Sequence, residues 1–375
     1  MTQSPLNLAS HRLVICLGPG GVGKTTISAA LAVRSVLEGR SVDVMTVDPA
    51  PRLLDALGLD ASSPELQDVP LDGIGGRARG NRKVNLRALK LDPKVTFDAL
   101  VARYAPSEAA RDAMLQNRIY RNLSNALSGV ADYMATEKLL ELYTAPNSDL
   151  IVLDTPPASD ALDFLDAPRR LLDLLNSRAL TLLGGASRGL MGGLKMIDIA
   201  ARAVLSAFDR LARLNLLADV QAFVDAFDGM YAGFAERAER AHKLLSAPET
   251  AIVVVTTANS GRITQATEFV AALEKAGMPV DAVIVNRTMA SLPDPSEISS
   301  LDIPASLKRK LRRNLADFQM LHERETRAFG ELRAASGEEI SILAAQDLGH
   351  EPRSLSDLAE IAKHLELIRP AAARS

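Results

Sequence analysis

The chain has 375 residues, of which 47% are hydrophobic and 24% charged, with a formal net charge of -3 and one cysteine. This length allows one large domain or two ordinary ones, and the composition is that of a globular protein rather than a disordered one. The near-neutral charge provides no overall attraction to nucleic acid or to an anionic membrane, and a lone cysteine excludes a disulfide within the chain.

The first residues, MTQSPLNLASHRL, lack the basic end and apolar core of a signal peptide, and no apolar run approaches the length of a membrane span. We therefore expect a cytoplasmic protein, with peripheral attachment to a membrane through a partner left open. Cys16 falls in the first apolar run, where it is expected to be a small buried hydrophobe rather than a ligand or a nucleophile.

Short runs rich in Val, Ile and Leu alternate with helical stretches along the chain. This alternation predicts an α/β fold with a doubly wound, mostly parallel sheet. The predicted strands are residues 13–17, 42–47, 84–91, 150–154, 251–256, 282–286 and 340–343.

Two helical stretches are far longer than a crossover between parallel strands requires. They predict a helical subdomain, about 95–147 and 166–247, embedded in a sheet core of about 12–94, 148–165 and 248–350. We expect the whole chain, 1–375, to form one such domain.

Residues 18–26 read GPGGVGKTT, which matches the complete G-x-x-x-x-G-K-[ST] pattern of a phosphate-binding loop between a strand and a helix. Lys24 is expected to reach the β and γ phosphates of a nucleotide, and Thr25 to give its hydroxyl to Mg²⁺. Glycines let the backbone N–H groups point inward and leave room for a phosphate. The other predicted nucleotide-binding residues of the loop are Gly18, Gly20, Gly21, Val22, Gly23 and Thr26.

Two aspartates end predicted strands, where a parallel sheet places its ligands. Asp48 ends the run in TVDPAPRLLDALG, and Asp154 ends the run in LDTPPASDALDFLDAP. An acid at the end of an apolar strand is the Walker-B arrangement, so Asp154 is expected to hold Mg²⁺ or its water. Either residue alone could be a helix cap or a turn residue. The P-loop makes a role at the nucleotide the better interpretation, with Lys24, Asp48 and Asp154 as the catalytic residues.

In this order, GPGGVGKTT, TVDPA, LDTPPASDALDFLDAP and VIVNR resemble the ArsA-type ATPases. That family of P-loop NTPases includes arsenite-pump ATPases and the ATPase that targets tail-anchored membrane proteins. The chain is most similar to its bacterial paired members. The resemblance implies ATP and Mg²⁺ as cofactors, hydrolysis of ATP by a nucleotide-sandwich dimer, and a helical subdomain that moves with nucleotide state. It also implies that Asp48 positions the attacking water and that Asn286, beside Arg287, recognises adenine. An Asn at this place is also an ordinary turn residue.

One departure from the family pattern affects the site. The family's loop reads GKGGVGKT, and its first lysine reaches the phosphates of the partner subunit, whereas this chain has Pro19 there. Loss of such a cation could cost about 10³-fold or more in turnover. Three interpretations stay open: a lysine supplied by a related partner in a heterodimer, a compensating cation such as Arg52 or Arg287, or a branch that works without it. In the heterodimer, this chain could be a weakly hydrolysing regulatory subunit.

Two metal sites of the family are not predicted here. Arsenite binding needs three thiolates and the dimer-clamping zinc site needs a C-x-x-C pair, whereas Cys16 is the one cysteine. ATP is favoured over GTP through Asn286 alone, since no clear N-K-x-D element is present.

The helical region is the predicted site for a partner or client. Apolar stripes in residues 197–234, including Phe223, Phe227 and Tyr231, indicate either ordinary core or a groove for a hydrophobic helix of a membrane protein. Residues 184–196 combine glycines with Leu and Met, as in an adaptable lid or a linker. Two basic clusters, 77–87 and 308–313, contain no aromatic residues and are interpreted as a solvated loop and a solvated helix face, not as nucleic-acid sites.

Overall fold

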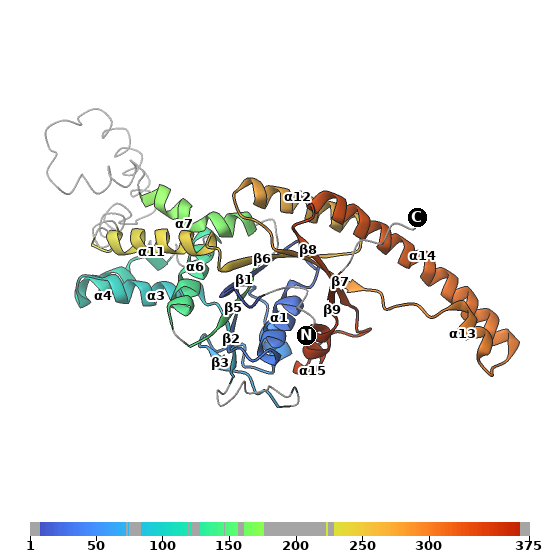
Figure 1. The fold of residues 1–375 in the computed structure, drawn as a ribbon. Coiled ribbons are helices and arrows are strands. Elements are labelled where there is room, and N and C mark those ends of the chain that lie inside the picture. The colour runs from blue at the N-terminus through green and yellow to red at the C-terminus, as the bar shows by residue number, and fades with distance from the viewer. Residues whose placement is uncertain are drawn as a thin grey trace, which may run out of the picture. The chain divides into compact units, whose positions relative to one another are not determined.

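The computed structural model describes residues 8–72, 74, 84–118, 120–121, 128–145, 147–156, 161–175, 223 and 229–367. The chain divides into two compact units. The sheet unit consists of Met1–Lys90, Ala145–Ala161 and Pro248–Ser375, and the helical unit of Leu91–Thr144 and Leu162–Ala247. The two units are described separately below (Figure 1).

A nine-stranded sheet with the order β3-β4-β2-β5-β1-β6-β7-β8-β9 forms the centre of the sheet unit. All neighbouring strands run parallel except the two outermost pairs, β3 with β4 and β8 with β9. The predicted α/β fold with a mostly parallel sheet is therefore confirmed. The strands are β1 (Leu13–Leu17), β2 (Val42–Thr46), β3 (Gln67–Asp68), β4 (Leu86–Lys90), β5 (Leu150–Asp154), β6 (Thr250–Thr257), β7 (Ala282–Thr288), β8 (Ser341–Gln346) and β9 (Leu365–Leu367).

The central strands read as apolar runs because both of their faces are buried. Every residue of β1, β2 and β5 is buried. Cys16 is buried and free, as predicted. Sequence analysis missed β3 and β9, which are short antiparallel edge strands with polar or mixed composition. They are strands because they pair with β4 and β8, and no run of apolar residues in the sequence predicts them.

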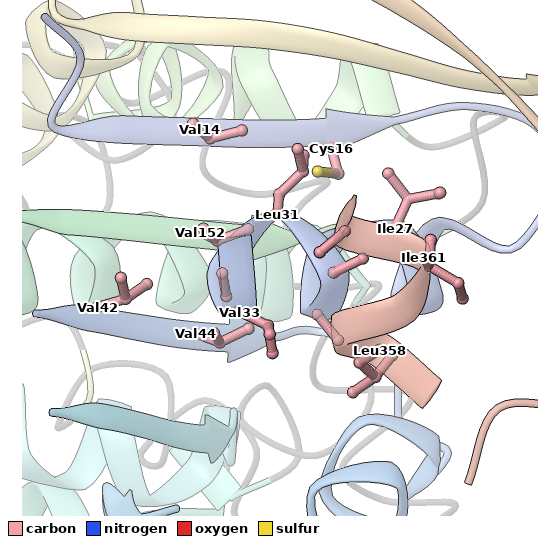
Figure 2. Packing of buried hydrophobic residues seen from close by; sticks show 14 of the residues in the cluster. Val14, Cys16, Ile27, Leu31, Val33, Val42, Val44, Val152, Leu358 and Ile361 are labelled. Atoms are coloured by element: carbon pink, nitrogen blue, oxygen red, sulfur yellow. The ribbon is translucent and has the colours of Figure 1, made fainter. Parts of the chain in front are cut away.

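Helix α1 lies at the centre of the main hydrophobic core (Figure 2). Its side chains Ile27 and Leu31 pack among Val14 and Val152 of the sheet and Ile361 of α15. Because α1 begins directly after the glycine loop, this packing fixes the position of the loop at the carboxyl end of β1. The helices of the sheet unit are α1 (Lys24–Leu37), α2 (Arg52–Leu57), α12 (Ser260–Lys275), α13 (Pro295–Ser300), α14 (Ala305–Ser336) and α15 (Leu355–Lys363).

The helical unit has its own apolar core, formed by Phe97, Tyr120, Tyr133, Phe234 and their neighbours. A buried ion pair also joins two of its helices, since Nε of Arg237 on α11 donates to Oε2 of Glu137 on α6. The described helices here are α3 (Pro93–Tyr104), α4 (Glu108–Gln116), α6 (Ser128–Thr144), α7 (Ala161–Leu175) and α11 (Tyr231–Leu245). Among the described residues, none of the helices in either unit has both the length and the apolarity needed to cross a bilayer.

Most of the sequence predicted to bind a client lies outside the described residues, namely 184–222 and 224–228. Phe223 and Tyr231 are described, and both are partly buried against the core of the helical unit. For these two aromatic residues the structure favours the core interpretation over the groove.

Candidate functional site

The glycine loop between β1 and α1 has a backbone that only glycine fits at two positions. Gly18 has φ 147°, and a Cβ there would lie 2.2 Å from the carbonyl oxygen of Val255. Gly23 has φ 88°, and a Cβ there would lie 2.2 Å from Nδ2 of Asn286. The first glycine lets the loop pass against β6, and the second lets it turn into α1.

Lys24 is the first residue of α1 and is held over the loop that precedes it. Its ammonium donates to the carbonyl oxygens of Gly18, at 3.0 Å, and Pro19, at 3.1 Å. Burial lowers the pKa of Lys24, and the negative charges of Asp154 and Asp48 partly oppose that shift. The ammonium of Lys24 therefore lies against the loop, close enough to the carboxylates of Asp154 and Asp48 to be affected by their charge.

Asp154 ends β5 in the middle of the sheet, in register with Cys16 of β1 and Thr46 of β2. Its Oδ2 accepts hydrogen bonds from the hydroxyls of Thr25, at 2.8 Å, and Thr46, at 2.9 Å. Its Oδ1 is buried and has no hydrogen-bond partner among the described residues. Complete burial raises the pKa of Asp154 to about 6, although both hydroxyls oppose the shift.

This arrangement fits a hard divalent cation. A buried carboxylate oxygen without a partner is costly, and a cation placed there would satisfy it. Oxygen atoms from a carboxylate and a hydroxyl are the ligands that Mg²⁺ prefers. Sequence analysis did not anticipate Thr46, which holds the carboxylate from the neighbouring strand.

Asp48 follows β2 in a tight turn. Its backbone N–H donates to the hydroxyl of Thr46 at 3.2 Å, and its Oδ1 accepts from the N–H of Ala50 at 2.9 Å. The side chain is therefore oriented by its own loop, and it lines the same cavity as Lys24. A carboxylate so fixed could accept a hydrogen bond from a water molecule near the loop.

Asn286, near the end of β7, supports the glycine loop. Its Nδ2 donates to the carbonyl oxygen of Val22 at 2.9 Å, and its Oδ1 accepts from the N–H of Arg287 at 2.9 Å. Sequence analysis assigned adenine recognition to Asn286 and did not foresee this contact with the loop. Arg287 has φ 56°, an uncommon left-handed conformation for a residue with a side chain, and it lines the cavity.

One cavity of about 1040 Å³ lies within the sheet unit at these strand ends. The predicted residues that line it are Gly20, Gly21, Gly23, Lys24, Thr25, Thr26, Asp48, Asn286 and Arg287. Gly18, Val22 and Asp154 are not lining residues, because they are buried in the layer beneath. Asp154 connects to the lining through the hydroxyl of Thr25.

Sequence analysis missed an entire wall of the cavity, formed by residues 346–353 with Leu358 and Ile361 of α15. This wall follows the carboxyl end of β8, a parallel strand beside β7. Loops after parallel strands gather at one edge of a sheet, so the run QDLGHEPR after a predicted strand was the signal that could have found it.

The cavity contains cations that are suited to an anionic ligand. Arg353 is paired with Glu351 at 2.8 Å. Arg52 and Arg287 also line the cavity, and both are near enough to Glu351 to contribute to lowering the pKa of that carboxyl. Arg52 is near enough to Lys24 to contribute to lowering its pKa. The cavity therefore has cations besides Lys24, together with the carboxylates of Asp48, Asp55, Asp347 and Glu351.

A profile of the protein family ArsA_ATPase, described as anion-transporting ATPase, matches residues 11–315. Curated relatives include ATPase GET3 of Podospora anserina, 31% identical over 196 residues that make up 51% of this chain and 53% of the relative. ATPase get3 of Aspergillus terreus is 30% identical over 207 residues, or 52% and 57% of the two chains. ATPase GET3 of Pyricularia oryzae is 30% identical over 196 residues, or 51% and 54%. The chain spans about half the length of the curated relatives that it matches. The predicted resemblance is confirmed.

Proposed function

The chain belongs to the ArsA family of anion-transporting ATPases, and from this membership and its cavity we propose that it binds ATP with Mg²⁺ and hydrolyses ATP. One observation carries the proposal. Lys24, Thr25 and Asp48 line a single cavity, and the hydroxyl of Thr25 donates to the buried carboxylate of Asp154 beneath it.

Each of these residues has a distinct role in the proposal. The loop N–H groups and Lys24 bind the phosphates, and Lys24 exchanges its bonds to Gly18 and Pro19 for bonds to phosphate oxygens. Thr25 and Asp154 hold Mg²⁺, which neutralises charge on the β and γ phosphates when bound. Asp48 orients the attacking water.

Asn286 has two roles in the proposal. Its contact with Val22 supports the loop, and we propose, from the family resemblance, that it also recognises adenine. The unpredicted wall at residues 346–353 completes the cavity around the base and ribose. Asn286 is the residue that favours ATP as the nucleotide in this proposal.

We further propose that the working form is a dimer and that nucleotide state moves the helical unit. The connectivity supports this output, because β5 ends at Asp154 and the chain enters the helical unit at Leu162. The family includes the ATPase that targets tail-anchored membrane proteins. We therefore propose a hydrophobic or membrane-protein client for the helical unit, and a cytoplasmic location for the protein.

Pro19 bears on a second candidate, a weakly hydrolysing subunit that works beside a lysine-bearing relative. The proline is buried, and its carbonyl accepts from Lys24. A lysine at this position would replace a buried residue, so Pro19→Lys is a poor test by itself. Arg52 is the better residue to change, because it already lies in the cavity near Lys24.

The test is steady-state ATP hydrolysis by the purified full chain, with ATP binding measured in parallel. Lys24→Ala and Asp48→Asn should reduce turnover by about 10²-fold or more, whereas Lys275→Ala, on the exposed end of α12, should not. Loss of turnover in Arg52→Ala with binding retained would make this arginine the compensating cation. ATP binding without turnover in the unmodified chain would refute self-sufficient hydrolysis and favour the heterodimer. No ATP binding at all would refute both candidates.

A further inference from the structure

Helices α13 and α14 follow one another and pack together as a hairpin at one end of the sheet unit (Figure 1). Among the described residues, seven large apolar side chains are exposed, and five of them lie between residues 295 and 321. The hairpin is also rich in basic residues. We name its end, residues 295–313, the basic tip. The five exposed apolar residues are Leu301, Leu307, Phe318, Met320 and Leu321.

The tip is little covered by the sheet unit. α14 packs on α12 and α13, and its buried residues lie mainly in its second half, with Leu315 the one buried residue of the first half. α13 is fastened to the start of α14, since Lys308 donates to the carbonyl oxygen of Ser299 and Arg312 to its hydroxyl, both at 2.9 Å. The tip is therefore held together by its own hydrogen bonds and is largely exposed to solvent.

Charge and apolarity are arranged along the axis of the tip. Leu301 and Leu307 stand at the turn between the two helices, 45% and 43% exposed. The run KRKLRR follows at residues 308–313, with the acidic residues Asp302 before it and Asp317 after it. Because successive helical residues are rotated by about 100°, the five basic side chains spread over about 200° of the circumference. The apolar end is therefore followed by a basic collar.

We propose that the basic tip docks end-on against an anionic lipid surface, with Leu301 and Leu307 entering the headgroup layer and the collar contacting lipid phosphates. A collar of six helical residues is about 9 Å tall, close to the headgroup layer of about 5–8 Å on each side of a bilayer. A protein partner with an acidic stripe would meet only part of such a collar. A second copy of the chain is disfavoured because two basic collars repel each other.

The proposal goes beyond ATP hydrolysis and does not depend on it. Sequence analysis interpreted residues 308–313 as a solvated helix face, and four of their five basic residues are indeed exposed; the proposal adds a function to that face. The near-neutral net charge of the chain gave no sign of it, since the positive charge is local.

Vesicle flotation with the full-length protein tests the proposal. Phosphatidylcholine vesicles containing phosphatidylglycerol should bind the protein, and pure phosphatidylcholine vesicles should not. Each Lys or Arg near an anionic surface contributes about a fivefold change in binding, so the collar variant R309Q/K310Q/R313Q should lose on the order of a hundredfold. High salt should reproduce the loss, because at about 1 M the Debye length is about 3 Å.

A matched control removes the same charge elsewhere. The variant K275Q/R324Q/R327Q changes three exposed basic residues of α12 and the second half of α14, and it should bind vesicles almost as the unmodified protein does. L301S/L307S should also weaken binding while the circular dichroism spectrum stays unchanged. Equal loss in the collar and control variants would overturn the proposal, and so would no binding to anionic vesicles, which would leave an acidic protein as the occupant.

Discussion

Replacement of Gly23 by alanine tests whether the Asn286 side chain holds the glycine loop in its conformation. A Cβ at residue 23 would lie 2.2 Å from Nδ2 and 3.5 Å from Cγ of Asn286. That amide is the donor that holds the carbonyl oxygen of Val22. The variant must therefore push the Asn286 side chain away from the loop.

The cost has two parts that can be separated. An alanine at φ 88° carries about 1–2 kcal/mol of backbone strain. Displacement of the Asn286 amide leaves buried polar groups unsatisfied, which costs about 1–3 kcal/mol more. Gly277→Ala is the matched control, because Gly277 has φ 77° but nothing lies within 4 Å of its would-be Cβ. That control should show only the strain.

Urea unfolding of the full chain measures both variants, and calorimetric titration with ATP measures the site. Gly23→Ala should be less stable than Gly277→Ala by about 1–3 kcal/mol, and it alone should weaken ATP binding. The double variant Gly23→Ala/Asn286→Ala removes the clash, so its cost should fall short of the summed single costs by about 1 kcal/mol or more. Equal costs for the two glycine variants, or strict additivity, would refute the reasoning.

Thr46→Val keeps the size of the side chain but removes one of the two hydroxyls that donate to Asp154. The Mg²⁺ concentration for half-maximal turnover should therefore rise severalfold, and an unchanged Mg²⁺ dependence would show that this contact does not support Mg²⁺ binding. Arg237→Met leaves the buried carboxylate of Glu137 without its cation and should lower the free energy of unfolding by about 3 kcal/mol or more. A loss below about 1 kcal/mol, measured by urea unfolding, would contradict a buried ion pair. Burial raises the pKa of Glu325, so its protonated form is favoured in the folded state and stability falls as pH rises through that pKa. Glu325→Gln should therefore gain in unfolding midpoint relative to the unmodified chain on going from acidic to neutral pH, and a pH-independent difference would count against this account.

The sequence was informative wherever a feature is local in the chain. The central strands could be predicted because burial on both faces demands unbroken apolar runs, as in LVICL and LIVLD. The P-loop could be predicted because its glycines and Lys24 are neighbours in the chain. Edge strands β3 and β9 could not, since their hydrogen-bond partners lie on distant segments.

The site shows the same division. Asp48 and Asp154 could be placed at strand ends, but the sequence could not show that Thr46 shares the carboxylate of Asp154 with Thr25. These three residues come from different elements and meet because β5 lies between β1, which leads into the loop and α1, and β2. The roles of these residues in hydrolysis stay predictions until the variants are measured.

What the sequence determined by itself is the α/β class, the glycine loop, the ArsA family and the candidate ligands at strand ends, because each is written in short-range patterns of burial, turn geometry and charge. The tertiary structure alone decided which distant groups share a cavity: Asn286 under the loop, residues 346–353 as a wall, and Arg52 near Lys24. It also decided that the basic residues after Leu307 lie in the first turns of α14, next to α13, where little of the helix is buried. Such contacts depend on the order in which strands pair and on which helix faces stay uncovered, and neither is encoded in any single stretch of the chain.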